Sequence, residues 1–303
     1  MLDLLGSSLL SAVRTSLWRL TRLMAPAMLW SLLRRVSGRG SDAGRTVCQL
    51  CVCVFLAQDL ADHITLSTNT IQRMSDGMQG LFPLLLTMMA AVGGASGSAI
   101  MQPAVVASAS TLTTLMTQVT VPLATASAIL TMLCHLGDGL RLHRLAAFVQ
   151  SLATWSLGIC FTVFIGVLTT RSVTAAALEG MTLRVSKYAL SHFIPVVGGL
   201  FADTVDTLVG SGMLVQSALG VTGLMIIAGY ALTPLCQTLA AGMLYRLASA
   251  LMQPVSDGAL SACIHDFGRV LMLLFIMQLC AAAMFLMLIA QLIAVSGMTM
   301  MLR

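Results

Sequence analysis

Long apolar blocks separated by short polar connections run through most of this chain of 303 residues. A helix of about twenty apolar residues is long enough to cross the hydrocarbon core of a membrane. Blocks of this length or longer lie at 81–101, 105–136, 145–169, 212–231 and 270–295. The block 48–57 crosses only if it is tilted or extended to about residue 66. The pattern predicts an all-α fold, a polytopic transmembrane helical bundle of about five to seven spans.

Two stretches between these blocks are more polar. Residues 171–192 are predicted to be the largest polar connection in the second half of the chain. Residues 235–252, which carry Arg246, are predicted to form an amphipathic or partly inserted helix of their own.

The first 36 residues follow a different pattern, that of a basic amphipathic helix. Leucines oppose a polar stripe with three- and four-residue spacing, formed by Ser8, Ser11, Thr15, Arg19 and Arg22. Such a helix lies on the membrane interface rather than across it. A Gly/Ser/Arg linker follows at 37–44. The sequence therefore predicts a basic amphipathic N-terminal region at 1–45 and a transmembrane domain at 46–303.

Segments 81–103 and 232–254 share ten identical positions without a gap, including Pro83/Pro234 and a common Met-Gln-Pro ending. Proline suits the first turn of a helix and stops a helix that runs into it. We therefore expect each copy to be a helix that starts near its proline and ends at Gln-Pro. An internal repeat is typical of permeases and channels, but apolar sequences also match one another by chance.

Composition supports the membrane interpretation. Hydrophobic residues make up 58% of the chain and charged residues only 9%, against about 25% charged in soluble domains. This excludes an ordinary soluble enzyme and a disordered tail. Seven of the sixteen lysine and arginine residues precede position 46. Arginines beside apolar segments indicate contact with lipid headgroups, and their low density argues against nucleic acid as a partner.

The chain lacks a recognisable catalytic, cofactor or metal motif. Cys48, Cys51 and Cys53 form a C-x-x-C-x-C pattern, but their apolar setting favours cysteine as a small hydrophobe. The loop residues His135, Asp138 and His143 are interpreted as solvated, because a metal site needs three or four convergent ligands. Phosphate-binding and nucleophile-elbow motifs are absent from the sequence. We therefore expect no enzyme activity, no cofactor and no metal.

A glycine-rich segment at 187–212 is the most informative stretch. Proline and glycine favour a broken backbone, and acids at membrane depth are functional candidates. One interpretation is a re-entrant or discontinuous helix that lines a wet path; the other is a surface helix whose acids are solvated. The candidate path-lining or hinge residues are Pro195, Gly198, Gly199, Asp203, Asp206, Gly210 and Gly212. Candidate helix-packing residues are Pro83, Gly93, Gly94, Gly97 and Pro234.

The same segment, with IPVVGG at 194–199 and DTVDTLVGS at 203–211, resembles the stage III sporulation protein AE family. Further stretches agree in the same order: LFPLLLTMMAAVGG at 81–94, FIGVL at 164–168, ALGVTGL at 218–224 and LMQPVSD at 251–257. The resemblance covers roughly residues 46–296. Two features depart from the family pattern. This chain starts in the arginine-rich helix, where family members usually have a cleavable signal and a longer polar region, so a truncated copy or a misassigned start is expected. Gln216-Ser217 stands where the family often has Lys-Asn.

The resemblance implies a non-enzymatic, multi-pass membrane component of the channel, a secretion-like complex, that joins mother cell and forespore in endospore-forming bacteria. It also implies that the protein is needed for forespore development. It places the chain in the mother-cell membrane around the forespore. The implied partners are a secretion-type ATPase and ring-forming proteins of the same operon, together with membrane lipid; a homo-oligomer is open. The alternative function, motivated by the repeat and the acids, is a secondary transporter or permease acting alone.

Overall fold

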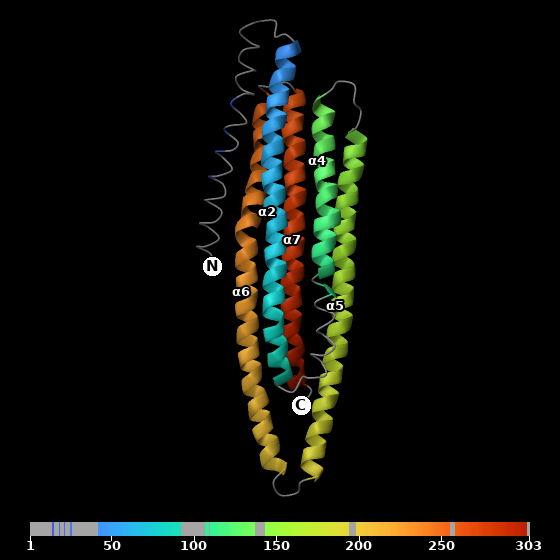
Figure 1. The fold of residues 1–303 in the computed structure, drawn as a ribbon, viewed down its shortest axis with the longest axis vertical. Helices are drawn as coiled ribbons and strands as arrows, with labels where there is room; N and C mark the ends of the chain where they lie inside the picture. The colour runs from blue at the N-terminus through green and yellow to red at the C-terminus, as the bar shows by residue number, and fades with distance from the viewer. Residues whose placement is uncertain are drawn as a thin grey trace. The chain divides into compact units, whose positions relative to one another are not determined.

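The computed structural model is helical along the part of the chain that it describes, which comprises residues 14, 18, 21, 25, 42–91, 107–108, 110–136, 143–193, 198–254 and 258–301. Its elements are α2 (Asp42–Ala91), the π-helical turn η1 (Met116–Thr120), α4 (Val121–Leu136), α5 (His143–Phe193), α6 (Gly198–Met252) and α7 (Gly258–Met301) (Figure 1). The all-α prediction is confirmed.

Among these described residues, five helical segments are long and apolar enough to cross a membrane. They are Gln49–Leu81, Ser110–Cys134, His143–Thr170, Gly220–Met252 and Leu260–Ala290. Their number agrees with the predicted range, and they support a multi-pass membrane protein. At a rise of about 1.5 Å per residue, each exceeds the roughly 30 Å of a hydrocarbon core.

The chain divides into two compact units. Unit 1 comprises Met1–Ile71, Thr114–Gly158 and Tyr230–Cys280, and unit 2 comprises Gln72–Thr113, Ile159–Gly229 and Ala281–Arg303. Helices α2, α5, α6 and α7 contribute residues to both. The predicted boundary at residue 45 stays a prediction.

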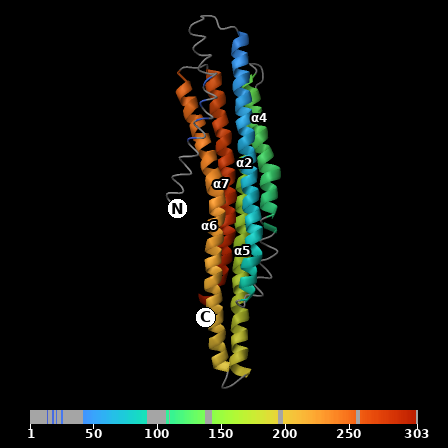
Figure 2. The same cartoon turned by 60° about the vertical axis from the view of Figure 1, so that its left-hand side comes forward.

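Three helices contact one another pairwise inside unit 1, and they lie side by side in both ribbon views (Figures 1 and 2). Tyr245 of α6 reaches Asp59 of α2, and Gln278 of α7 reaches Ser67 of α2. Helices α6 and α7 approach closely at Gly268, where an added Cβ would lie 3.3 Å from the backbone of α6. Glycine permits this approach, as is usual where membrane helices pack.

Polar side chains also join α6 to α7 near their connection. The Ser249 hydroxyl donates to the carbonyl of Ser261 (2.8 Å), and the Ser261 hydroxyl donates to the carbonyl of Ser249 (3.1 Å). Both serines are buried. The two reciprocal bonds satisfy polar groups that lipid could not.

The prediction that each copy of the repeat starts a helix at its proline is wrong. Pro83 lies inside α2 and Pro234 inside α6. Proline is tolerated within a membrane helix when neighbouring groups satisfy the backbone that it frees, so the apolar helix continues through it. The expected ending of the second copy is confirmed: α6 ends at Met252 and Gln253-Pro254 form a turn. The ending of the first copy, with Gly93, Gly94 and Gly97, lies outside the described residues.

Two further boundaries differ from the sequence prediction. The polar stretch 171–192 is helical within α5, and 235–252 continues α6 instead of forming a separate helix. The isolated polar residues in these stretches do not interrupt the backbone hydrogen bonds, because a helix satisfies them internally. The apolar blocks therefore merge into helices of 50, 51 and 55 residues.

The predicted span 105–136 contains a backbone irregularity just before its proline. The amide of Val121 donates to the carbonyl of Met116, five residues back, which defines the π-turn η1. Pro122 follows directly and offers no amide. Such a π-turn widens the helix locally and is one of the recognised ways in which a helix accommodates a kink.

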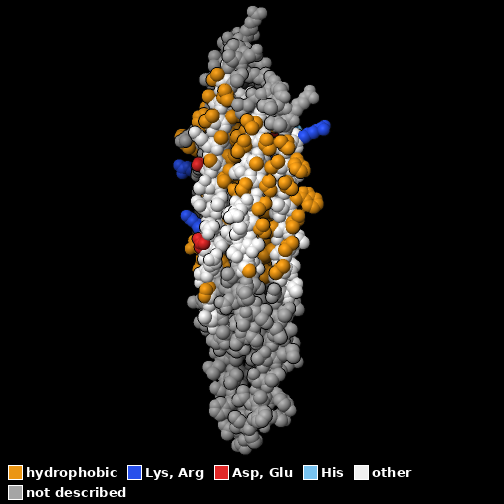
Figure 3. Space-filling view, turned by 45° about the vertical axis from the view of Figure 1, so that its right-hand side comes forward, with side chains coloured by type: hydrophobic (Ala, Val, Ile, Leu, Met, Phe, Trp, Pro, Cys, Tyr) orange, Lys and Arg blue, Asp and Glu red, His pale blue; other side chains and the backbone are white. Residues whose placement is uncertain are grey.

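Large apolar side chains are exposed along the part of α5 in unit 1. They are Leu145, Phe148, Leu152 and Trp155. Figure 3 shows hydrophobic side chains gathered on one face of the described part of the chain. Exposed apolar surface of this extent suits contact with lipid.

The N-terminal region is described only at Arg14, Trp18, Thr21 and Ala25, which are helical and exposed. The remainder of the predicted amphipathic helix lies outside the described residues.

Candidate functional site

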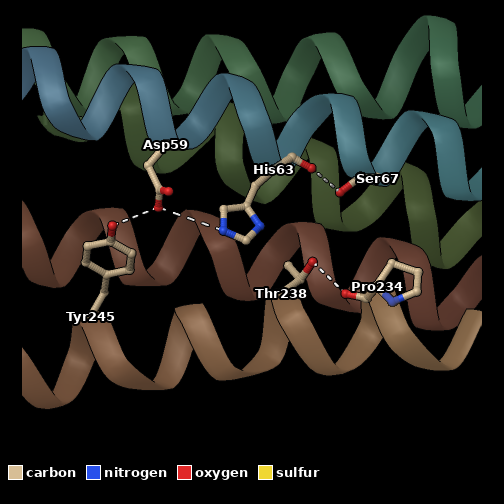
Figure 4. A network of polar contacts seen from close by, with 6 residues as sticks. All are labelled: Asp59, His63, Ser67, Pro234, Thr238 and Tyr245. Atoms are coloured by element: carbon tan, nitrogen blue, oxygen red, sulfur yellow. Dashed lines mark hydrogen bonds and ion pairs between the residues drawn. The ribbon is translucent and has the colours of Figure 1, made fainter. Parts of the chain in front are cut away.

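Polar side chains from three helices form a buried cluster in unit 1, which we call the Asp59 cluster. It comprises Asp59, His63 and Ser67 of α2, Tyr245 of α6 and Gln278 of α7. The four-residue spacing of the first three places them on one face of α2. That face is directed toward α6 and α7 (Figure 4).

Tyr245 anchors one end of the Asp59 cluster. Its hydroxyl donates to Oδ2 of Asp59 at 2.7 Å, and Asp59 and Tyr245 are only 8% and 2% exposed. The Tyr245 ring also packs edge-on against Phe267 of α7, with centroids 5.0 Å apart. Edge-to-face packing fixes the ring, so the hydroxyl is held toward the carboxylate. A hydrogen bond to an ionised carboxylate is among the stronger ones in proteins.

His63 approaches the same carboxylate from one turn along α2. Its Nε2 lies 3.8 Å from Oδ2 of Asp59, which is longer than a hydrogen bond but within ion-pair range. A protonated imidazole here would neutralise the carboxylate, which lowers the cost of an acid away from water. The carboxylate and the imidazole therefore lie close enough to interact electrostatically.

Ser67 and Gln278 extend the cluster by a further turn. The Ser67 hydroxyl donates to the carbonyl of His63 (2.7 Å), and Nε2 of Gln278 donates to Oγ of Ser67 (2.6 Å). Both residues are fully buried. Oε1 of Gln278 has no hydrogen-bond partner among the described residues. A buried amide oxygen without a hydrogen bond costs free energy. Packing alone therefore does not explain why position 278 is a glutamine.

Thr238 and Pro234 of α6 lie near the cluster (Figure 4). The Thr238 hydroxyl donates to the carbonyl of Pro234 at 3.0 Å, and both residues are buried. Hydroxyl bonding of this kind helps to satisfy a helix backbone near proline. Pro83, the matching residue of the repeat, is exposed on α2.

Two cysteines of the C-x-x-C-x-C pattern, Cys51 and Cys53, differ in their surroundings. Cys51 is exposed, whereas Cys53 is buried and its thiol is in hydrogen-bonding contact with that of Cys263 of α7. Within the described part of the chain, His, Cys, Asp and Glu residues form no group of three that could hold a metal ion. Cys53 therefore belongs to the contact between α2 and α7.

Comparison with known proteins places this helical chain. The family model for stage III sporulation protein AE matches residues 1–296. The chain belongs to this family. Stage III sporulation protein AE of Bacillus subtilis (strain 168) is 29% identical over 240 residues, which cover 79% of this chain and 60% of that protein. The chain thus matches less than two thirds of that relative's length. No solved structure matches the chain.

The segment that carries the family motif lies at the beginning of α6. Gly198 and Gly199 open the helix, and Asp203, Asp206, Gly210 and Gly212 follow within it. The backbone is therefore continuous from Gly198 onward, while Pro195 lies outside the described residues, as do the side chains of both acids. Whether Asp203 and Asp206 face a wet path stays a prediction.

The Asp59 cluster is not among the sites predicted from the sequence. Its signal was present on α2, where Asp59, His63 and Ser67 interrupt an apolar pattern at four-residue spacing. Their partners follow 186 residues later for Tyr245 and 211 residues later for Gln278. Nothing in the local pattern of this stage III sporulation protein AE family member predicts those pairings.

Proposed function

We propose that this chain is a non-enzymatic integral membrane subunit of the channel, a secretion-like complex, between mother cell and forespore. The proposal rests on the family match over residues 1–296. The five candidate spans support a membrane location, and we assign it to the mother-cell membrane around the forespore. Its proposed partners are a secretion-type ATPase and ring-forming proteins of the same operon.

The polar groups of the Asp59 cluster are suited to joining helices inside a membrane. One carboxylate, one imidazole, a phenol, an amide and a hydroxyl lie between packed helices. These groups can hold helices together.

Co-purification from sporulating cells tests the proposal. An epitope-tagged chain is expressed in its endospore-forming host, extracted in mild detergent and captured at the stage when the forespore is engulfed. We expect the ATPase and ring-forming proteins of the operon to be captured with it, and deletion of its gene to stop forespore development. Capture of the chain without these proteins, together with normal forespore development in the deletion strain, would contradict the proposal.

A second candidate function is secondary transport by the chain alone. It is favoured by the buried Asp59–His63 pair within the candidate span Gln49–Leu81, since acids and histidines inside membranes often relay protons. The purified chain in proteoliposomes is tested for proton- or sodium-coupled flux, with Asp59→Asn and Asp203→Asn as variants. Flux without any partner, abolished by either variant, would favour this function over the channel subunit.

A further inference from the structure

Helix α2 exposes apolar side chains at Val54 and Phe55, but from residue 58 to residue 69 it exposes a row of polar ones. Gln58, Asp62, Thr65 and Asn69 are all exposed, and the Thr65 hydroxyl donates to its own helix at the carbonyl of Ala61 (2.8 Å). These four residues, which we call the Gln58 face, lie in the candidate span Gln49–Leu81. A polar face on a membrane helix is costly against lipid.

Neighbouring helices expose apolar side chains at the same depths. Tyr245 contacts Asp59, and on either side of Tyr245 helix α6 exposes Met243 (59%) and Leu247 (56%). Arg246 is also exposed there, but a long arginine side chain can reach the headgroups while its stem stays in apolar surroundings.

Further along α2, near Ser67, polar residues of α2 again lie at the same depth as exposed apolar residues of a neighbouring helix. Gln278 contacts Ser67, and beside Gln278 helix α7 exposes Ile276 (43%) and Leu279 (47%). At this level α2 exposes Thr65 and Asn69. Lipid around α6 and α7 would therefore also surround the Gln58 face, unless another protein surface covers it.

The spacing of the Gln58 face indicates a second helix as its cover. Its positions alternate by four and three residues, and the same alternation continues at Gln72, Asp76 and Gln79, which are also exposed. An alternation of four and three is the seam along which two helices wind around each other. Polar residues in such seams drive helix association inside membranes.

The chemistry of the Gln58 face fits a copy of itself. Each carboxamide of Gln58 and Asn69 carries both donors and an acceptor, so a face of amides can bond to the same face of another molecule. A two-fold arrangement brings identical patches together. We propose that the Gln58 face binds the Gln58 face of a second copy of this chain within the membrane.

Disulfide cross-linking between copies tests this surface. In a cysteine-free chain, single cysteines replace Gln58, Thr65 or Asn69, and the controls carry Leu152→Cys on α5 or Leu247→Cys on α6, both exposed apolar positions. Two differently tagged copies are co-expressed and oxidised in native membranes. We expect a doubly tagged dimer at the three α2 positions, at least about tenfold above the controls, a ratio equivalent to about 1.4 kcal/mol.

Three results would overturn the proposal: dimer no greater than in the controls, cross-linking of the α2 cysteines to a different protein, or their reaction with a water-soluble maleimide without dimer. The second assigns the face to a heterologous partner and the third to a wet path. All are independent of whether the channel partners co-purify.

A second experiment uses the native cysteines. Gln58→Leu combined with Asn69→Leu removes both amides, and we expect co-purification of the tagged copies to fall about tenfold. Oxidation of Cys53 with Cys263 serves as the folding control, because these thiols lie in contact between α2 and α7. Undiminished co-purification of copies would overturn the proposal; the single-cysteine experiment decides it independently if the variant does not fold.

Discussion

At the scale of single residues, the Tyr245–Asp59 hydrogen bond is the contact on which the Asp59 cluster depends most. Tyr245→Phe leaves the ring packing on Phe267 but removes the hydroxyl that donates to this buried carboxylate at 2.7 Å. We expect a loss of about 1–3 kcal/mol in the free energy of unfolding. The measurement is thermal unfolding of the purified chain in detergent.

Tyr230→Phe is the matched control for this prediction. Tyr230 lies on the same helix but is 51% exposed, so loss of its hydroxyl should change the unfolding temperature little. Equal unfolding temperatures for the two variants would show that the Asp59 bond does not contribute to stability.

A second prediction at this scale concerns Ser67 and Gln278. Substitution of Ser67 should destabilise the protein more than substitution of Gln278. Ser67→Ala leaves the Gln278 amide without its acceptor and should cost about 1–3 kcal/mol. Gln278→Met removes a buried amide whose Oε1 is already unsatisfied within the described part, and should be nearly neutral or stabilising. Ser67 then keeps its bond to the His63 carbonyl.

A double-mutant cycle measures this coupling by chemical or thermal unfolding. The double variant Ser67→Ala with Gln278→Met should be more stable than Ser67→Ala alone. Additive effects would mean that the hydrogen bond between these residues carries no free energy.

At the scale of helices, the contact between α2 and α7 is open to direct test. The thiols of Cys53 and Cys263 are hydrogen-bonded to each other, and neighbouring thiols on packed helices can be joined by mild oxidation when their geometry permits. We expect copper-phenanthroline to give an intramolecular disulfide, seen as faster migration on a non-reducing gel. Cys53→Ser and Cys263→Ser should each abolish the shift, whereas Cys160→Ser should not. A shift that survives both of the first two variants would exclude this packing of α2 against α7.

Helix type and membrane character could be predicted from the sequence, but helix ends could not. Pro83 and Pro234 indicated helix starts by the rules for water-soluble helices, yet both lie inside helices. In an apolar environment, backbone groups without hydrogen bonds cost free energy, which favours a continuous helix. This cost overrides the local preference of proline for the first turn of a helix. The turn at Gln253-Pro254 was predicted correctly. A proline stops a helix that runs into it, and α6 ends at Met252, just before Gln253-Pro254.

The Asp59 cluster marks the same limit for the site. Spacing alone shows that Asp59, His63 and Ser67 share a face of α2. It does not show whether that face meets lipid, water or protein, and Tyr245 and Gln278 come from helices far along the chain. The sequence predicted Asp203 and Asp206 as site residues instead, because they belong to a local motif. A pairing between distant segments leaves no such local motif.

At the scale of the whole molecule, the surface must divide into a part that faces lipid and a part that does not. The exposed face of α5 in unit 1 is apolar at Leu152 and Trp155, the latter 71% exposed, and belongs to the candidate span His143–Thr170. Arg144 is exposed at the beginning of the same helix.

A thiol reacts as a thiolate, which forms poorly in lipid. In a cysteine-free chain in native membranes, Arg144→Cys should therefore react with a water-soluble maleimide, while Leu152→Cys and Trp155→Cys should react at least about tenfold more slowly. Denaturation in detergent should then expose all three equally, which controls for the reagent. Rapid labelling at 152 and 155 in intact membranes would mean that this apolar face meets water or a wet partner, and that α5 does not cross the bilayer at this level.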